Sequence, residues 1–170
     1  MSEKLMIDLQ PFCSKDETRY QLTKPWSRDG YTWATDGRVL LRIPGVHAEP
    51  NPEAPNAEKL GTFFSTGPEI TMPKIPFLET KPCAWCKGRG RVCTCDFCDN
   101  KACICDGCDG TGKIEKAVSV PVGAGRFSNH YLAKIATLPG LRLFPSSDDP
   151  TAAMFFIFDG GCGYLMGMCV

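Results

Sequence analysis

The cysteines of residues 83–112 constrain this chain more than any other feature. Eight of its eleven cysteines fall in these thirty positions, within CAWCKGRGRVCTCDFCDNKACICDGCDGTG. The N-terminal MSEKLMIDLQ lacks the apolar segment of a secretory signal, and no apolar run of 18 residues occurs, so we expect a soluble, cytoplasmic chain with no membrane contact. In a reducing compartment, thiols usually serve metal binding or catalysis instead of disulfides.

The spacing of these cysteines is typical of zinc sites. Three C-x-x-C pairs occur, Cys83/Cys86, Cys95/Cys98 and Cys105/Cys108, and Cys93 and Cys103 are each separated by one residue from a pair. A tetrahedral zinc takes two such pairs, so eight thiolates predict two zinc ions per chain. Because four sulfurs leave no position for water, the predicted role is structural. Disulfides and an iron–sulfur cluster are the alternatives.

The motif C-x-x-C-x-G-x-G occurs at 83–90 and again at 105–112. It resembles the cysteine-rich domain of the DnaJ chaperone family. That resemblance implies an outer zinc held by Cys83, Cys86, Cys105 and Cys108, and an inner zinc held by Cys93, Cys95, Cys98 and Cys103. The middle stretch CTCDFCDNKACIC lacks the repeat glycines, and the chain has no His-Pro-Asp triplet of a J-domain. A co-chaperone role is therefore not predicted.

The module also carries candidate contact residues. Lys87, Arg89 and Arg91 form a basic ridge that suits phosphate, and apolar or stacking contacts can come from Trp85, Phe97 and Ile104. The alternative is that these are the ordinary charges and core residues of a small zinc module. Segment 81–116 has seven basic and five acidic residues, and two thiolate-bound zinc ions bring its charge to about −2. That charge disfavours strong non-specific binding of nucleic acid.

The remainder of the chain is expected to fold as one discontinuous domain. At 170 residues, with 43% hydrophobic content, the chain has room for one core and one small module. Prolines are dense from Pro44 to Pro82, which indicates connecting chain before an insertion. We therefore predict a domain of residues 1–80 plus 114–170, interrupted by a zinc-binding insert at 81–113.

Local patterns predict an α+β fold. Asp36-Gly37 is expected to form a type I′ turn between strands 31–35 and 38–43. Further strands are predicted at 69–72, 114–123 and 141–144, and two more join at Gly160-Gly161 near the C-terminus. Apolar spacing from Phe127 to Leu138 predicts a helix of about 8 to 10 residues, capped by Ser128 or Asn129.

Three stretches of the sequence, within 12–45 and 118–168, resemble a second family. They are ETRYQLTKPWSRDGYTWATDGRVLLRIPG, RFSNHYLAKIATLPGLRLF and FFIFDGGCGYLMGM, and they resemble the sliding clamp of bacterial DNA polymerase III. The resemblance implies one clamp-like domain of two β-α-β-β-β halves about a pseudo-twofold axis, with its first helix in SEKLMIDLQP. A ring would need six copies, hence a homo-oligomer. Arg126 and Lys134, beside His130, would be its charges toward DNA.

Nothing in the sequence predicts catalysis. His47 and His130 lack a neighbouring nucleophile, and Asp148-Asp149 is typical of a turn. The stretch GAGRF lacks the lysine and frame of a phosphate loop. The cysteines outside the module are expected to be core or free thiols: Cys13, Cys162 and Cys169. No enzyme and no small-molecule substrate are expected.

These observations predict a non-enzymatic, zinc-stabilised, clamp-like accessory protein of DNA replication or repair that binds DNA or a replication protein. Its nineteen basic and nineteen acidic residues balance, so the chain as a whole has no net charge that attracts nucleic acid. Binding of DNA would therefore need a local basic patch. A compact single domain with an insert suits a phage protein. The alternative is a protein-interaction adaptor whose DnaJ-like module binds a polypeptide on a clamp-like scaffold.

Overall fold

The computed structural model describes residues 7–55, 67–92, 103–105, 107–108 and 110–168. The chain divides into two compact units. Unit 1 comprises Met1–Ile75 and Ser119–Val170, and unit 2 comprises Pro76–Val118. The division therefore falls five residues outside the limits of 81 and 113 expected for the insert, because the chain on both sides of the cysteines also belongs to unit 2.

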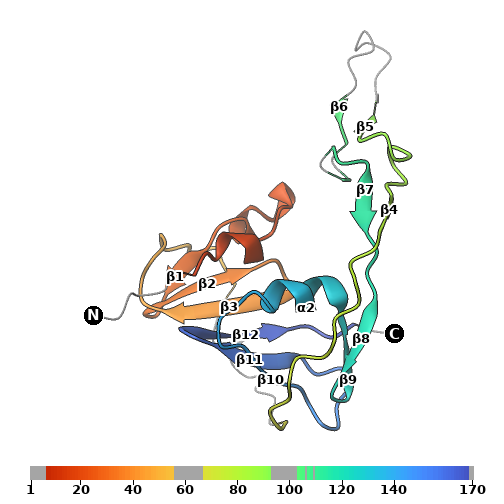
Figure 1. Cartoon of the computed structure of the whole chain (residues 1–170). Coiled ribbons are helices and arrows are strands. Elements are labelled where there is room, and N and C mark those ends of the chain that lie inside the picture. Colours follow the sequence, from red (N-terminus) through yellow and green to blue (C-terminus); the bar gives the residue numbers. More distant parts are fainter. Residues whose placement is uncertain (1–6, 56–66, 93–102, 106, 109, 169–170) are drawn as a thin grey trace. The chain divides into compact units, whose positions relative to one another are not determined.

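Unit 1 is built on a six-stranded antiparallel sheet (Figure 1) with the order β1-β2-β3-β12-β11-β10. The strands from the first part of the chain are β1 (Trp26–Arg28), β2 (Tyr31–Thr35) and β3 (Val39–Pro44). The last part supplies β10 (Arg142–Phe144), β11 (Met154–Phe158) and β12 (Gly161–Leu165). Two three-stranded meanders therefore meet through their last strands, where Leu41 pairs with Gly163.

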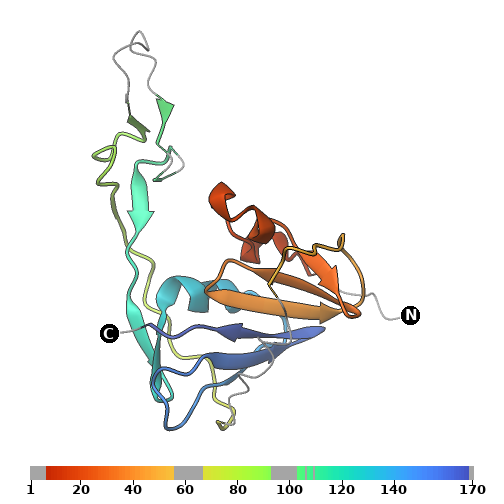
Figure 2. The same cartoon turned by 180° about the vertical axis from the view of Figure 1, so that it is seen from behind.

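Short helices cover one face of this sheet (Figures 1 and 2). They are η1 (Gln10–Phe12), η2 (Glu17–Leu22) and α2 (Asn129–Ile135), and α2 follows the hairpin of β8 (Ser119–Val122) and β9 (Gly125–Ser128). The core between helices and strands includes Phe12, Leu132, Ile135, Leu41 and Phe156. The strands alternate accordingly: in β11, Met154, Phe156 and Phe158 are buried. The described chain is mostly sheet with few helices, an α+β fold.

Several predicted elements differ from the structure. The strand expected over 114–123 is wrong, because it is divided between β7 (Lys113–Glu115) in unit 2 and β8 in unit 1. Helix α2 has seven residues, and Ser128 occupies its N-cap position without a side-chain cap hydrogen bond. The helix expected at residues 2–11 lies partly outside the described residues, and its end forms the 3-10 turn η1. The strand expected at 69–72 is a single bridge between Ile70 and Leu143.

The type I′ turn was predicted at the wrong Asp-Gly pair. Asp29 and Gly30 have φ values of 54° and 77°, and they link Arg28 to its partner Tyr31 in a two-residue hairpin. At the second pair, Gly37 has a φ of 89° but Asp36 does not have a positive φ. Thr35 pairs with Leu40, so a longer connection joins β2 to β3. The final hairpin also turns through Asp159-Gly160, because Phe158 pairs with Gly161.

The Asp36 side chain stabilises the turn between β2 and β3 and also contacts helix α2. One carboxylate oxygen accepts hydrogen bonds from the amides of Arg38 (2.9 Å) and Val39 (3.1 Å). The other accepts from the Tyr131 hydroxyl at 3.0 Å and lies 3.8 Å from the Lys134 ammonium. Burial, together with the Asp36 charge, raises the pKa of Tyr131 to about 12. Asp36 therefore connects the first hairpin to α2.

None of the helices in the described part of the chain has the length and apolar character that a membrane crossing requires.

Candidate metal centre

Unit 2 brings the two C-x-x-C-x-G-x-G repeats together by pairing short strands. β4 (Thr80–Pro82) pairs with β7 just outside the repeats, and β5 (Arg91–Val92) pairs with β6 (Cys103–Ile104) between them. Both pairs are antiparallel. Each repeat is thereby held at both of its ends against the other, which fixes the position of four cysteines.

Cys83, Cys86, Cys105 and Cys108 form a buried group that can hold a metal ion. Their four Sγ atoms lie within 4.8 Å of one another. The Sγ atoms of Cys83 and Cys105 are 3.9 Å apart, and those of Cys86 and Cys108 are 3.7 Å apart. A tetrahedral zinc with Zn–S bonds of ~2.3 Å places its sulfurs roughly 3.8 Å apart. The donor set and its spacing therefore fit zinc, and these are the four cysteines predicted for the outer site.

The two repeats make equivalent contacts at residues 22 positions apart. The amide of Gly90 donates to Cys86 Sγ and the amide of Gly112 donates to Cys108 Sγ, both at 3.2 Å. Across the repeats, the Cys83 amide donates to Gly112 (2.8 Å) and the Cys105 amide to Gly90 (3.0 Å). The site is therefore an approximate twofold pair of knuckles, in which backbone amides stabilise charge on sulfur.

The last glycine of each repeat permits this close approach. Gly90 and Gly112 both have a φ of 73°, a backbone conformation that residues with a side chain rarely adopt. A Cβ at Gly90 would also collide with the carbonyl oxygen of Gly110, and one at Gly112 with that of Gly88. The second glycine of each repeat is thus required by contact between the repeats as well as by local turn geometry.

Gly90→Ala is expected to weaken metal binding at least 100-fold, because the knuckles must separate to admit the methyl group. Competition with a chelator of known zinc affinity measures this effect. Gly30→Ala is the matched control, since Gly30 has a similar φ of 77° but nothing within 4 Å of an added Cβ. That variant should retain full metal affinity and lose roughly 1 kcal/mol of stability. Equal metal affinity in the two variants would contradict the close packing of the repeats.

The thiols of the site differ in how readily they ionise. Burial disfavours the Cys86 thiolate, but the Gly90 amide and the neighbouring thiols outweigh it and lower the pKa of Cys86 to about 7. Burial is the main cause that raises the pKa of Cys105 to about 12, and the neighbouring thiols add to it. Without metal, Cys105 therefore keeps its proton at neutral pH, and a metal ion must displace it.

We expect the apparent zinc affinity to fall at least about tenfold for each pH unit between pH 8 and pH 6. The sign follows because protons and zinc compete for the same sulfur, and at least the proton of Cys105 is released on binding. Chelator competition at several pH values measures the slope. An affinity independent of pH over this range would show that sulfur is not the ligand.

The predicted inner site lies almost entirely outside the described residues. Cys93, Cys95 and Cys98 fall in the range 93–102, and Cys103 is described as part of β6 through its backbone. One four-cysteine group is thus shown within the described residues.

The predicted contact residues divide between the two units. Trp85, Lys87, Arg89 and Arg91 are exposed in unit 2, whereas Phe97 lies outside the described residues. Arg89 Nε donates to the carbonyl of Cys86 at 3.2 Å, and Arg91 is the cross-strand partner of Ile104, which is also exposed. The basic ridge is thus anchored at Arg89 to the metal knuckle.

The two cations of unit 1 take part in contacts within that unit. Arg126 donates to Ser119 Oγ at 2.8 Å. Lys134 lies near Asp36 and over the rings of Phe12 and Tyr131. The charge of Lys134 therefore balances the carboxylate of Asp36, to which the sequence assigned only a turn. Its contact with the helix was missed because a short Asp-Gly turn signal says nothing about a helix 95 residues further along the chain.

The groups set aside for catalysis lie in ordinary structural positions. The amide of His47 donates to Thr32 Oγ1, and Asp149 forms a turn by accepting from the amide of Thr151 at 2.8 Å. Burial raises the pKa of Cys13 to about 11, so it is an unreactive core thiol. Cys162 lies 3.1 Å from Arg42 Nε, and Cys169 is outside the described residues.

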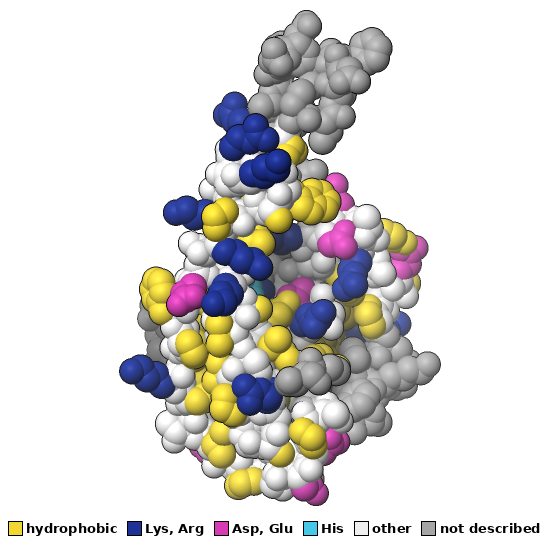
Figure 3. All heavy atoms as spheres, turned by 90° about the vertical axis from the view of Figure 1, so that its right-hand side faces the viewer, with side chains coloured by type: hydrophobic (Ala, Val, Ile, Leu, Met, Phe, Trp, Pro, Cys, Tyr) yellow, Lys and Arg dark blue, Asp and Glu magenta, His cyan; other side chains and the backbone are white. Residues whose placement is uncertain are grey.

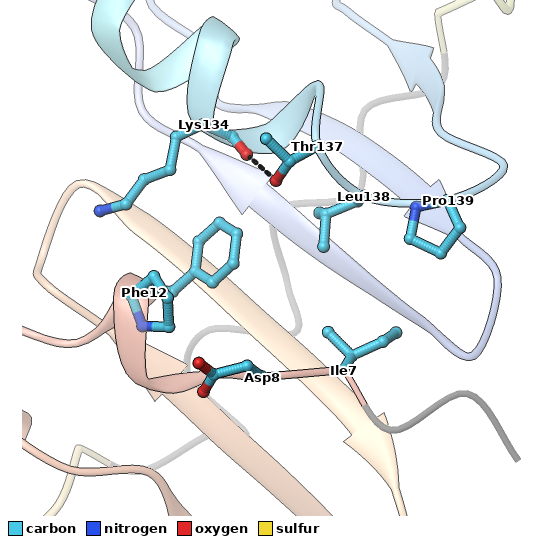
Figure 4. Close-up of a pocket in the computed structure, with 8 residues that line it drawn as sticks. Ile7, Asp8, Phe12, Lys134, Thr137, Leu138 and Pro139 are labelled. Atoms are coloured by element: carbon cyan, nitrogen blue, oxygen red, sulfur yellow. Dashed lines mark hydrogen bonds between the residues drawn. The ribbon is translucent and has the colours of Figure 1, made fainter.

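Unit 1 also has a cavity of about 460 Å³ between η1 and the end of α2 (Figure 4). Its walls are mainly apolar, with Asp8 and Lys134 as the charged side chains. In Figure 4 the Lys134 side chain extends past the ring of Phe12, and Thr137 donates back to the Lys134 carbonyl.

Comparison of the chain with models of known protein families, with curated proteins and with solved structures finds no match.

Proposed function

We propose that this chain is a non-enzymatic, zinc-stabilised accessory protein of DNA replication or repair that binds DNA or a replication protein. The observation that carries the proposal is the closed group of four buried thiols beside an exposed basic ridge. Such a group stabilises a fold and leaves no open position for a reacting water. Its role is to hold Lys87, Arg89 and Arg91 on a rigid knuckle.

The sheet of unit 1 supports a clamp-like body. Its order β1-β2-β3-β12-β11-β10 has the symmetry expected of two similar halves, each with a helical segment before a three-stranded meander. η1 and η2 take the place of a helix in the first half, and α2 is the helix of the second. The proposal includes the second zinc of Cys93, Cys95, Cys98 and Cys103, and self-association of six copies if a ring forms.

Binding to DNA tests this proposal directly. The zinc-loaded full chain is titrated against a labelled 20-base-pair duplex and against one of its strands, at low and at physiological salt. Binding to either should weaken with salt, and replacing Lys87, Arg89 and Arg91 together by alanine should reduce it. Lys24→Ala, an exposed cation of unit 1, is the control. Sedimentation equilibrium tests the ring, because a strict monomer cannot encircle DNA.

The second candidate is a protein-interaction adaptor. Trp85 and Ile104 are large apolar side chains that remain exposed in unit 2, and exposed apolar residues of this kind suit a polypeptide partner. An adaptor should bind a reduced, unfolded polypeptide with little dependence on salt. If neither the duplex nor the single strand binds but such a polypeptide does, the adaptor is favoured over the DNA-binding protein.

A further inference from the structure

The indole ring of Trp85 packs against unit 2 on one side and is otherwise exposed to solvent. The chain has three tryptophans, and Trp26 and Trp33 are buried with 1% and 5% exposed, whereas Trp85 is 76% exposed. A Cβ added at Gly107 would lie 3.6 Å from the indole atoms Cγ and Cδ2. The indole therefore lies against Gly107 and is largely open to solvent elsewhere.

The repeat symmetry explains why the ring has this position. Trp85 and Gly107 are equivalent residues of the two knuckles, each located between the two cysteines of its pair. The first knuckle supplies an indole where the second has glycine, and the ring lies within van der Waals range of that glycine's Cβ position. Metal binding at the four thiols would fix both knuckles and hence the orientation of the indole.

The charges near Trp85 favour a polyanion over an apolar peptide. Lys87, Arg89 and Arg91 follow Trp85 at alternate positions and are all exposed. Figure 3 shows Lys and Arg side chains gathered on the described part of unit 2, with hydrophobic side chains beside them. An aromatic ring next to several cations is the combination by which proteins hold bases and phosphates of single strands.

Base stacking is expected to contribute more to the affinity than the phosphate contacts do. Segment 81–116 has seven basic and five acidic residues, and two thiolate-bound zinc ions would change its formal charge from positive to about −2, so the module cannot hold nucleic acid by charge alone. Stacking on one aromatic side chain accounts for roughly a 5- to 150-fold change in affinity per base. An exposed indole stacks on an unpaired base, whereas in a duplex the faces of each base are already covered by its neighbours.

We propose that unit 2 binds single-stranded DNA by stacking an unpaired base on Trp85 while Lys87, Arg89 and Arg91 contact its phosphates. This inference rests on the proposed role in DNA metabolism and specifies the form of DNA that the module takes. It makes Trp85 the main determinant of affinity and the three cations the determinants of salt dependence.

The test uses the zinc-loaded full chain and a fluorescein-labelled 15-mer of thymidine as the probe. Trp85→Ala should weaken binding at least about tenfold by anisotropy, without changing the zinc content. Phe77→Ala is the control, because Phe77 is an equally exposed aromatic of unit 2, 87% exposed, and should bind as wild type. An unlabelled 15-mer should also quench the fluorescence of Trp85, since the two buried tryptophans are shielded from it.

Salt and competitors complete the test. The plot of log affinity against log salt should have a slope no steeper than about −2, because three phosphate contacts on a single strand contribute roughly −0.7 each. A duplex of equal length should compete at least tenfold less well than the single strand, and a uridine 15-mer shows whether RNA is bound by the same contacts.

The outcomes separate this inference from the proposed function. Binding of a duplex, or of a replication protein, that is unaffected by Trp85→Ala would overturn the inference and leave the proposed function intact. Displacement of the thymidine probe by an apolar unfolded peptide as readily as by DNA would point to the adaptor and overturn the inference. Absence of binding to any DNA at low salt would overturn the inference together with the DNA-binding form of the proposed function.

Discussion

Cys83→Ser is expected to remove the metal from the four-thiol site and to unfold unit 2 while unit 1 stays folded. A structural zinc site contributes an apparent binding free energy of about 10–16 kcal/mol at neutral pH. Among the residues that the structure describes, the apolar core of the site is otherwise small, since the partly buried side chains packed on the four cysteines are Val92 and Ile114. Loss of one thiolate therefore removes most of the stabilisation of this unit.

Zinc analysis and limited proteolysis measure this effect. The wild-type chain should hold two zinc ions if the inner site exists, and Cys83→Ser should hold one fewer. New cleavage should appear within Pro76–Val118 and not in the sheet, whose core residues belong to the other unit. Cys162→Ser is the matched control, because Cys162 is a partly exposed thiol outside the module. A Cys83→Ser chain with unchanged zinc content would refute the four-thiolate site.

Asp36→Ala is expected to lower the free energy of unfolding of unit 1 by about 3 kcal/mol. The substitution leaves the amides of Arg38 and Val39 without their carboxylate acceptor, and it leaves the Tyr131 hydroxyl and the Lys134 ammonium without their partner. Polar groups that lose a partner in a part-buried setting cost about 1–3 kcal/mol each when they cannot reach water. The Asp36 side chain is 14% exposed, so water replaces it poorly.

Asp149→Ala is the control for this substitution. Asp149 also accepts hydrogen bonds from a turn, at 2.8 Å and 2.7 Å from the amide and hydroxyl of Thr151, but it is exposed. Its loss should cost much less stability than the loss of Asp36, because water can take over both bonds. Urea unfolding followed by the near-ultraviolet signal of the buried Trp26 and Trp33 reports on unit 1. Equal effects of the two substitutions would contradict the connecting role of Asp36.

Tyr131→Phe separates the parts of this network. It removes one hydrogen bond to Asp36 but leaves the turn amides and Lys134 in place, so its cost should be clearly smaller than that of Asp36→Ala. The double variant should be less destabilised than the sum of the single variants, since both remove the same bond.

The candidate metal site could be predicted closely from the sequence, and the fold less so. The pairs Cys83/Cys86 and Cys105/Cys108 were predicted because a C-x-x-C knuckle is a local structure whose spacing determines how two sulfurs face one metal, and the resemblance to the DnaJ cysteine-rich domain implied that these two pairs share one ion. The strands β2 and β3 were predicted within one residue because alternating apolar residues around a turn signal are also a local pattern. The turn types were wrong, because two Asp-Gly pairs seven residues apart have the same local signal. Their difference arises from contacts outside the turns.

The sequence alone determined the two C-x-x-C pairs that can face a metal, and that the chain has strands at both ends with an insertion between them, because these depend on contacts between near neighbours. The structure brings the two pairs together in one group, although they are 22 positions apart. The tertiary structure decided how distant segments meet: β3 pairs with β12, Asp36 bonds Tyr131, and Gly90 lies against Gly110. These contacts join residues that are 20 to more than 100 positions apart. Their geometry depends on packing of the whole unit, which no short stretch of sequence encodes.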